Sequence, residues 1–437
     1  MSTVAGPRVA VVGAGWAGLA AAVALVRAGC AVQVFEAAAQ AGGRARSLPV
    51  TLPNGDCALL DNGQHILIGA YTQTLALMRS LGLDPDALLM RTPLRLRFPD
   101  GSGLSLPHWP APLDVLAGLA GVRSWPLRQR LGLLATALRW RMRGFACDAK
   151  LSVAQLCHGL GSAVQRELIE PLCVSALNTT PENASASVFL RVLHDALLGP
   201  VGSSHLLLPL QPLGALGPEA ALHWLAQRGA AVSLGRRVPA PQPQASGAWT
   251  VLDQAFDHVV WATSWHHAVL ALSSIAQDTT NSIALWVRRW LAVARALQPS
   301  AIATVYTSGA GVRLAAPMLA LHAHAQAPAQ FVFDRGQLGG PPGLLAWVVS
   351  AARGGAKDLT EATLTQARDQ LGLKLTPVKT VVEKQATFAC TPGLQRPGPR
   401  IAPGLWACGD YVEGPYPATL EAAVRSGQDA ARLIIDA

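Results

Sequence analysis

The chain has 437 residues, of which 51% are hydrophobic and 14% are charged, so it can bury a sizeable core and is not dominated by disorder. Its 35 basic residues outnumber its 26 acidic ones, a balance compatible with nucleic acid, an anionic membrane surface or an acidic substrate. We expect no nucleic-acid partner, because the sequence lacks a recognition-helix motif, a zinc finger and an aromatic–basic RNA signature.

Hydropathy and cysteine usage exclude further classes. No run of about 18 uncharged apolar residues is present, so a membrane-spanning helix is not expected. The apolar run at residues 9–12 ends at once at Gly13 and Gly15. This run is too short for the core of a signal peptide, so the sequence predicts a cytoplasmic protein. The seven cysteines are odd in number and form no C-x-x-C pair, so we expect no disulfide framework and no metal site.

The first elements in chain order form a strand–helix–strand unit. Residues 8–12 predict a short buried strand, residues 16–27 an alanine- and leucine-rich helix, and residues 31–35 a second strand. Gly29 after the helix is typical of a helix end, because glycine tolerates the left-handed conformation. Such a unit builds a parallel sheet, so the predicted fold class is α/β.

The turn between this strand and helix carries a dinucleotide-binding fingerprint, Gly-x-Gly-x-x-Gly. The first glycine permits the tight turn, the second lets a pyrophosphate approach the backbone, and the third lets helix and strand pack closely. The phosphates then meet the free N–H groups of the helix start, and an acid at the end of the second strand can hold both ribose hydroxyls. A turn without a ligand is the alternative, but the strand, helix and acid in register favour the nucleotide. The expected contacts are Gly13, Gly15, Trp16, Ala17, Gly18 and Glu36.

The acid at position 36 could bind the ribose of FAD or of NAD equally well, but a second glycine pair distinguishes between the two cofactors. Gly42, Gly43 and Arg44 follow Glu36 after five residues and can enclose the pyrophosphate from its second side while offsetting its charge. An ordinary NAD dehydrogenase does not need them. This E-x5-G-G-R pattern resembles the flavoprotein amine oxidase and phytoene desaturase superfamily, which implies FAD. For Arg44 alone, a surface salt bridge would be the alternative.

The middle of the chain alternates helices, strands and turns. Helical patterns are expected at 72–82, through much of 109–198, and at 218–228 and 360–371. Strand patterns occupy 231–234, 249–252 and 258–262, and the apolar runs between 300 and 350 predict an antiparallel sheet. Gly- and Pro-rich stretches at 239–247 and 336–343 predict surface loops.

The C-terminal part carries a second motif, a strand-like 404–408 that ends in Gly409 and Asp410 before a helix predicted over 418–434. Asp410 can accept a hydrogen bond from a sugar-alcohol hydroxyl such as the flavin ribityl chain. The helix start, at Thr419 and Leu420, would direct free N–H groups at the flavin pyrimidine. This G-D-x6-P-A-T-x-E text resembles the closing flavin motif of the same superfamily. An ordinary strand end before an ordinary helix is the alternative.

Two weaker segments complete the nucleotide domain. Residues 229–238 resemble the superfamily strand whose valine, here Val238, touches the adenine ring, and residues 257–263 resemble the strand that returns beneath the nucleotide. The resemblance implies a Rossmann-like FAD-binding domain (GR2-type flavoprotein) with an interleaved α+β substrate domain that carries an antiparallel sheet and helices. The division it predicts is 1–75, 200–265 and 385–437 for the FAD-binding domain, and 76–199 and 266–384 for the substrate- and membrane-facing domain.

The segment 61–71 is the most specific. Its D-N-G-Q-H-x-L-x-G-A-Y text resembles the squalene-associated FAD-dependent desaturases, now understood as hydroxysqualene dehydroxylases. The resemblance implies reductive removal of the allylic hydroxyl of hydroxysqualene, a C30 isoprenoid, to give squalene for hopanoid synthesis. It also implies a functional partnership with squalene-synthase-like enzymes upstream. We expect the FAD to be bound noncovalently.

That reaction needs a proton for the departing hydroxyl and a hydride from reduced FAD, in a site that excludes water. We expect Asp61, Gln64 and His65 beside the flavin, with His65 as the first candidate proton donor and Gln64 as the second. A histidine hydrogen-bonded to backbone is the alternative for His65. Thr419 stands where amine oxidases of this fold commonly place an aromatic cage residue, which disfavours an amine substrate; Tyr416 lies three residues earlier.

Residues 109–145 combine tryptophans and arginines with one acid, Asp114. On a helix over 127–143 one stripe is apolar and arginines flank it, a pattern typical of peripheral contact with the inner, cytoplasmic face of a membrane. An amphipathic helix packed on its own domain is the alternative. The stripe is Leu127, Leu131, Leu134, Leu138 and Met142, and the flank is Arg128, Arg139 and Arg143.

Two other functions remain open. One is an FAD-dependent desaturase or oxidase of carotenoid precursors or amines, which shares the fold but runs the flavin chemistry in the opposite direction. The other is an inactive flavin-binding subunit that tethers prenyl enzymes to the membrane.

Overall fold

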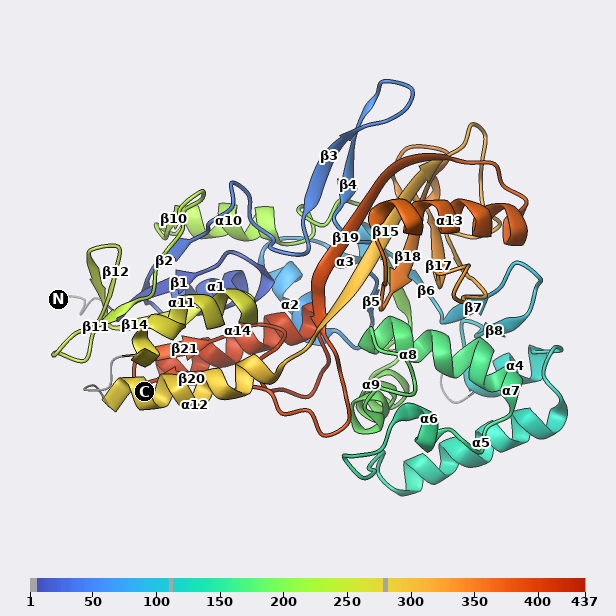
Figure 1. Cartoon of the computed structure of the whole chain (residues 1–437), viewed down its shortest axis with the longest axis horizontal. Coiled ribbons are helices and arrows are strands. Elements are labelled where there is room, and N and C mark those ends of the chain that lie inside the picture. The colour runs from blue at the N-terminus through green and yellow to red at the C-terminus, as the bar shows by residue number, and fades with distance from the viewer. Residues whose placement is uncertain (1–5, 110–112, 278–281, 437) are drawn as a thin grey trace.

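The computed structural model describes residues 6–109, 113–277 and 282–436. A main sheet organises one half of the molecule, at the left of Figure 1, and runs in the order β10-β2-β1-β14-β21-β20. Neighbouring strands are parallel except β20 and β21, and the predicted strand–helix–strand unit lies at the centre. The strands are β1 (Arg8–Val12), β2 (Ala31–Phe35), β10 (Ala231–Ser233), β14 (His258–Trp261), β20 (Arg400–Ala402) and β21 (Leu405–Ala407).

Helix α1 (Trp16–Arg27) is almost wholly buried, because α14 (Leu420–Ile435) packs closely against it. A Cβ atom on Gly427 would lie 2.1 Å from the carbonyl oxygen of Ala17, so the two helices approach this closely only because residue 427 is glycine. Burial of each large apolar side chain of α1 contributes about 1.5–3 kcal/mol. The helices beside this pair are α2 (Thr72–Ser80), α3 (Pro85–Leu88) and α10 (Pro218–Ala226).

Helices α11 (Trp265–Gln277) and α12 (Ser282–Ala296) also lie beside the main sheet (Figure 1). The sequence-based division put residues 266–384 in the substrate domain, whereas these two helices pack on each other and α12 packs on β20. Their buried faces explain the placement, since Val287 and Leu291 are fully covered and the indole of Trp290 donates to the carbonyl of Gly398 at 2.9 Å. A small meander precedes β14, formed by β11 (Gln242–Pro243), β12 (Trp249–Val251) and β13 (Gln254–Phe256), so the loop predicted at 239–247 contains a short strand.

The predicted antiparallel sheet forms the second half of the molecule, in the order β16-β17-β18-β15-β19. Two of its strands are long: β15 (Pro299–Ser308) and β19 (Thr376–Phe388) pair antiparallel and run from this sheet toward the main sheet (Figure 1). Helix α13 (Ala356–Leu371) packs on them. The other elements are β16 (Met318–Ala320), β17 (Phe331–Asp334), β18 (Leu344–Ser350) and a 3-10 helix (Arg335–Leu338), which replaces part of the loop predicted at 336–343.

A helical lobe lies below the antiparallel sheet, as Figure 1 shows. Asn178 connects the lobe to the sheet. It ends α8 in the left-handed conformation (φ 47°), donates from its amide to Thr387 Oγ1 at 2.9 Å, and accepts from the backbone of Ala351 at 2.6 Å. The lobe contains α4 (Leu113–Gly121), α5 (Leu127–Met142), α6 (Val153–Leu156), α7 (Ser162–Val164), a π-helix (Gln165–Ile169), α8 (Glu170–Leu177) and α9 (Ala186–Leu198).

Short strands join these parts. Hairpin β3–β4 projects from the top of Figure 1, and β5 pairs with β9, which also pairs with β6. Their bounds are β3 (Ser47–Thr51), β4 (Cys57–Asp61), β5 (Leu67–Ile68), β6 (Leu89–Thr92), β7 (Arg95–Arg97), β8 (Gly103–Ser105) and β9 (Leu206–Pro209).

Candidate functional site

The glycine turn after β1 leaves the start of α1 open. Gly13 has φ 114°, and a Cβ atom there would lie 2.7 Å from the carbonyl oxygen of Ala262; one on Gly18 would lie 1.9 Å from the carbonyl oxygen of Gly13. Only glycine therefore fits at these two positions. Because the N-cap Gly15 has no side chain, the amides of the first turn, from Trp16 and Ala17 onward, can bind an anion.

Glu36 lies at the carboxyl end of β2, as predicted. Its two carboxylate oxygens accept from the backbone N–H groups of Ala14 and Ala38, at 2.7 and 2.8 Å. These bonds fix the carboxylate beside the glycine turn, where it can accept from ribose hydroxyls. Val238 lies farther along, beyond the end of β10, and its side chain is buried.

The second glycine pair lies directly over the first turn. The N–H of Gly42 donates to the carbonyl of Ala14 at 2.9 Å, and a Cβ atom on Gly43 would lie 3.3 Å from the Cα atom of Gly15. The two turns follow the carboxyl ends of β1 and β2, so they meet at one edge of the main sheet. Two glycine turns therefore approach each other with no side chain between them, as an enclosed pyrophosphate requires.

Arg44 joins the two terminal motifs. Its guanidinium contacts Asp410 Oδ1 at 2.6 Å and donates to the carbonyl of Ala386 at 2.5 Å. Burial lowers the pKa of Arg44, but the neighbouring Asp410 carboxylate outweighs it, so the pKa lies above its ordinary value. The ion pair therefore holds Arg44, which we expect to neutralise a pyrophosphate, beside Asp410, which we expect to accept a hydrogen bond from a ribityl chain.

The closing motif follows β21. The N–H of Gly409 donates to Ser426 Oγ at 3.1 Å, which holds Asp410 against α14. Helix α14 begins at Leu420, two residues later than predicted, because Thr419 is its N-cap and accepts from the N–H of Ala422 at 3.1 Å. The positive end of the α14 dipole still points toward the junction of the two halves.

These groups fit FAD. A carboxylate for a ribose lies at one end, two crossed glycine turns and a helix start lie in the middle, and a second helix start lies at the other end. The adenine end would contact Glu36, the pyrophosphate would contact the 13–18 and 42–44 turns, and the flavin would lie near Asp410 and Thr419. No group of three or more potential metal ligands occurs within the described ranges.

In the 61–71 segment, Asp61 has a positioning role. Its side chain is buried and accepts from Ser47 Oγ and from the backbone of Leu213, both at 2.9 Å, while its carbonyl accepts from the hydroxyl of Tyr306 at 2.8 Å. Burial raises the pKa of this carboxyl. A Cβ atom on Gly69 would lie 1.9 Å from the carbonyl oxygen of Gly202, so only glycine fits at position 69.

Gln64 and His65 lie together at the junction of the halves. The side-chain carbonyl of Gln64 accepts from Arg335 at 3.3 Å, and its backbone N–H contacts Thr304 Oγ1 at 3.4 Å. His65 Nδ1 lies 2.8 Å from the carbonyl oxygen of Gly63, so in the neutral ring Nδ1 carries the proton and Nε2 is bare. Burial lowers the pKa of His65, which favours this neutral form.

A small, mainly apolar hollow adjoins the start of α14. Apolar side chains of β5, α8 and α9 line it, among them Ile68, Ala176 and Val192, together with Tyr71, Tyr416 and Thr419. Tyr416 donates from its hydroxyl to Asp195 Oδ2 at 2.5 Å. Asp195 comes from α9 and lies 221 residues away in sequence, so no local motif predicts this pair. The sequence singles out Tyr416 only by its place near Thr419.

The fold and this arrangement define a flavin-dependent oxidoreductase. Residues 16–435 match the family of flavin-containing amine oxidoreductases, so the chain belongs to that family and is an FAD-dependent enzyme. Among curated proteins it is similar to the hydroxysqualene dehydroxylase of Rhodopseudomonas palustris, with 28% identity over alignments covering 98% of each chain. It is also similar to the enzyme of the same name from Sinorhizobium fredii, with 26% identity and 97% of each chain covered.

Solved structures share the fold at lower identity. An oxidoreductase from Methanosarcina mazei matches with a TM-score of 0.72 and 15% identity, covering 97% of this chain and all of the other. Cyclohexylamine oxidase from Brevibacterium oxydans matches with a TM-score of 0.63 and 18% identity, covering 99% of each chain. At such identity these structures show the architecture alone.

Proposed function

We propose that the protein reductively removes the allylic hydroxyl of hydroxysqualene and gives squalene, in the route to hopanoids. The observation that carries the proposal is the 61–71 segment, whose Gln64 and His65 lie at the junction where the two halves meet, in a chain similar from end to end to dehydroxylases. Thr419 occupies the position where an amine oxidase of this fold commonly has an aromatic residue, and the aromatic side chains that line the hollow are Tyr71 and Tyr416 instead.

The reaction balances as follows. Reduced FAD, when bound, supplies a hydride to the allylic carbon and is oxidised. The carbon–oxygen bond breaks, and the oxygen takes a proton and leaves as water. The protein's tasks are to exclude bulk water from the allylic cation, to hold the apolar chain, and to deliver one proton at the departing oxygen. His65 and Gln64 are the donors that the sequence predicts.

A desaturase of carotenoid precursors is the second candidate, because 121 aligned residues, 27% of this chain, are 36% identical to the hydroxyneurosporene desaturase of Cereibacter sphaeroides. That similarity is local, whereas similarity to the dehydroxylases covers the chain. A desaturase removes hydride from its substrate and therefore begins with oxidised FAD, so the direction of electron flow separates the two.

The test is a product assay without oxygen. Protein holding chemically reduced FAD is mixed with hydroxysqualene, and the extract is analysed by mass spectrometry. We expect squalene in an amount equal to the flavin oxidised. Phytoene or an amine that bleaches oxidised flavin, together with unchanged hydroxysqualene, would instead assign an oxidase, and inertness toward all three substrates would assign a non-catalytic subunit.

A further inference from the structure

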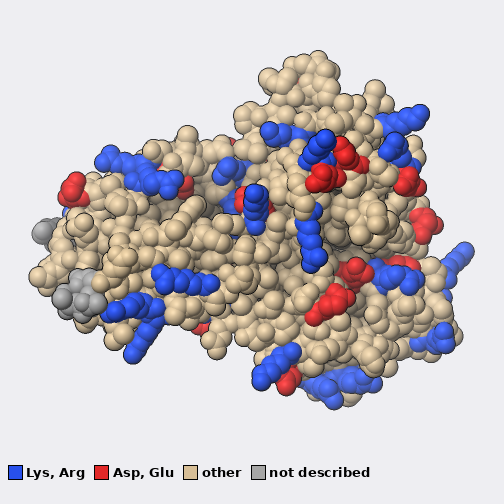
Figure 2. Space-filling model, in the orientation of Figure 1, with Lys and Arg blue, Asp and Glu red and all other residues tan. Residues whose placement is uncertain are grey.

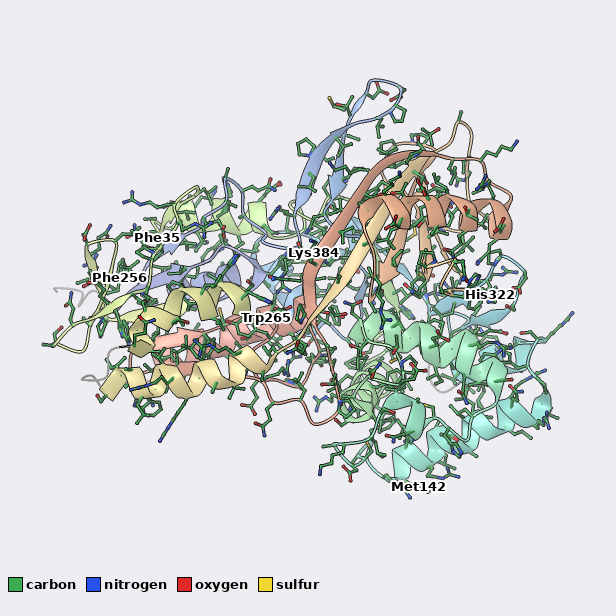
Figure 3. All side chains as sticks on the ribbon, in the orientation of Figure 1. Phe35, Met142, Phe256, Trp265, His322 and Lys384 are labelled. Atoms are coloured by element: carbon green, nitrogen blue, oxygen red, sulfur yellow. The ribbon has the colours of Figure 1, made fainter. Side chains whose placement is uncertain are left out.

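The outer face of α5 is apolar although nothing in the described part of the chain covers it. Leu127, Leu131, Leu138 and Met142 are 56–73% exposed, while Leu133 and Trp140 on the opposite side are buried. Figure 3 labels Met142 at the outer edge of the helical lobe. Leu134, which the sequence put in the stripe, packs on the core instead, and Ala135 takes its place on the exposed face.

Helix α4 continues this surface. Leu113 and Leu116 are about half exposed, as is Trp109 just before the helix. Arg130 of α5 joins the two helices, because its guanidinium donates to the carbonyl oxygens of Trp125 and Ala120, at 2.9 and 3.1 Å. We call Trp109, Leu113, Leu116, Leu127, Leu131, Leu138 and Met142 the α4–α5 surface. Residues 110–112 of the predicted membrane segment lie outside the described residues.

Charge around the α4–α5 surface is mainly basic, although the exposed Asp148 lies near Arg139 and Arg143. Arg123, Arg128, Arg139, Arg141 and Arg143 are exposed, and no side-chain hydrogen bond or ion pair from them is formed within the described residues. Between residues 109 and 147 the only acid is Asp114, which is buried. Figure 2 shows basic side chains along the lower edge of the lobe, where α5 runs in Figure 1.

We propose that the α4–α5 surface docks on an anionic lipid bilayer, with its leucines in the acyl boundary and its arginines at the headgroups. An exposed apolar stripe flanked by arginines has the composition that such an interface requires. A second copy of the chain would bring like charges together, which disfavours self-association through this surface. Within the described residues no helix is long and apolar enough to cross a membrane, so the contact is peripheral. The inference is independent of the reaction proposed above.

Vesicle flotation of the FAD-loaded protein tests the docking. We expect flotation with phosphatidylcholine vesicles that contain phosphatidylglycerol, and much less with phosphatidylcholine alone. Arg128→Gln/Arg139→Gln/Arg143→Gln should weaken binding about a hundredfold, since each basic residue near the surface contributes a factor of about five. Leu131→Gln/Leu138→Gln/Met142→Gln should weaken it at least as much.

Two matched controls carry similar changes elsewhere. Leu270→Gln/Leu285→Gln alters exposed leucines of α11 and α12, and Arg313→Gln/Arg353→Gln/Lys357→Gln alters exposed basic residues beside the antiparallel sheet. Both should float like the parent. Absent binding by the parent, or equal loss in the controls, would overturn the proposal. Size-exclusion chromatography showing a parent dimer that the leucine variant dissociates would assign the surface to a second copy instead.

A separate observation concerns the proton. Three side chains connect solvent to the apolar hollow: the imidazole of His194, which is 43% exposed, contacts Asp195 Oδ1 at 2.7 Å, and Asp195 Oδ2 accepts from Tyr416 at 2.5 Å. Arg191 also contacts Asp195 at 3.0 Å, and Arg425 lies 5.2 Å from the Tyr416 ring. The chain ends beside Thr419, at the α14 start where the flavin is expected.

We infer that this chain delivers the proton to the departing oxygen, an inference that rests on the proposed reaction. In the resting arrangement the Tyr416 hydroxyl donates to Asp195, so delivery begins when charged His194 protonates Asp195. Asp195 then donates to the Tyr416 oxygen, and the Tyr416 hydroxyl turns to give its own proton to the departing oxygen, which leaves as water. The carbon takes the hydride that reduced FAD would supply when bound, and His194 takes a new proton from solvent. What distinguishes Tyr416 from His65 is its connection to solvent through Asp195 and His194, whereas the Nδ1–H of His65 is held by the Gly63 carbonyl.

Single-turnover reoxidation of reduced enzyme by hydroxysqualene separates the donors. Tyr416→Phe should slow it about a hundredfold or more and reduce the solvent isotope effect, while His65→Ala should stay within about tenfold of the parent. The flavin content of each variant is measured first, and rates are compared per bound flavin. A parent rate retained in Tyr416→Phe would overturn the inference, and a large loss in His65→Ala alone would return the role to His65. A parent that does not react at all would contradict the proposed reaction, not the proton route.

Discussion

Gly15 is the residue at which flavin binding can be separated from folding. Its φ is ordinary, and a Cβ atom there would lie 4.0 Å from the Cα atom of Gly43, a normal contact. Gly15→Val therefore fits the protein but fills the path of a pyrophosphate to the start of α1. We expect bound FAD to fall at least about tenfold with circular dichroism unchanged.

The control is Gly121→Val at the end of α4, where a Cβ atom meets nothing within 4 Å, and it should keep its flavin. Gly18→Val should fail to fold, since its side chain would collide with the turn backbone. Heat should release FAD from the parent. A yellow Gly15→Val protein, or flavin that stays on the denatured parent, would contradict this account of the site.

His65 makes stability depend on pH. Its pKa in the folded protein lies below the ordinary value of 6.5, because burial disfavours the charged ring. As pH falls below that ordinary value, the unfolded chain binds a proton that the folded chain does not, so the folded state loses stability. Above it, neither state is protonated and the difference disappears.

Thermal unfolding of FAD-loaded protein should therefore show a smaller acid-side loss for His65→Gln than for the parent. His267→Gln, at an exposed position of α11, should follow the parent curve. Parallel curves for the parent and His65→Gln down to mildly acidic pH would show that His65 is not held neutral.

At the scale of elements, a buried carboxylate joins the first and last parts of the chain. Glu421 of α14 is completely buried and accepts from the backbone N–H groups of Gln73 and Thr74, at 3.1 and 2.9 Å, and from the Thr74 hydroxyl at 2.8 Å. Arg425 contacts it at 2.7 Å. Glu421 thus caps α2 and sets the distance between α2 and α14, which fixes the start of α14, where we expect the flavin.

Glu421→Gln keeps the shape but replaces charge-assisted bonds and leaves one amide hydrogen poorly paired. We expect a loss of about 2 kcal/mol of unfolding free energy. Asp429→Asn on the same helix removes half of an exposed ion pair with Arg432 and should cost less than about 1 kcal/mol. Equal midpoints for the two variants in denaturant titrations would refute the capping role.

Elements with local signatures could be predicted, and contacts between distant elements could not. The 8–35 unit and the 409–421 motif were readable because turn glycines, caps and strand-end acids act within a few residues of each other. The Tyr416–Asp195 pair has no such signature, since it depends on how α9 packs against the closing loop. For α5, periodicity predicted an apolar stripe for membrane contact and left packing on the helix's own domain open, because Leu133 and Trp140 on the other side are equally apolar and it is tertiary packing that buries them.

At the scale of the whole molecule, three parts of the fold meet at one junction. The main sheet supplies the nucleotide turns, the long strands β15 and β19 connect the halves, and the helical lobe lines one side of the hollow and carries the α4–α5 surface (Figure 1). This arrangement lets an apolar substrate be handled by the same lobe that we propose contacts lipid. The direction of flavin chemistry decides whether the whole acts as a reductase, as we propose.

The most direct test of that claim is anaerobic stopped-flow mixing of photoreduced enzyme with hydroxysqualene. We expect the flavin to reoxidise in a single turnover and squalene to appear in equal amount. Reduced flavin that persists with hydroxysqualene, in an enzyme whose oxidised flavin is bleached by an amine or a carotenoid precursor, would contradict the account and assign an oxidase.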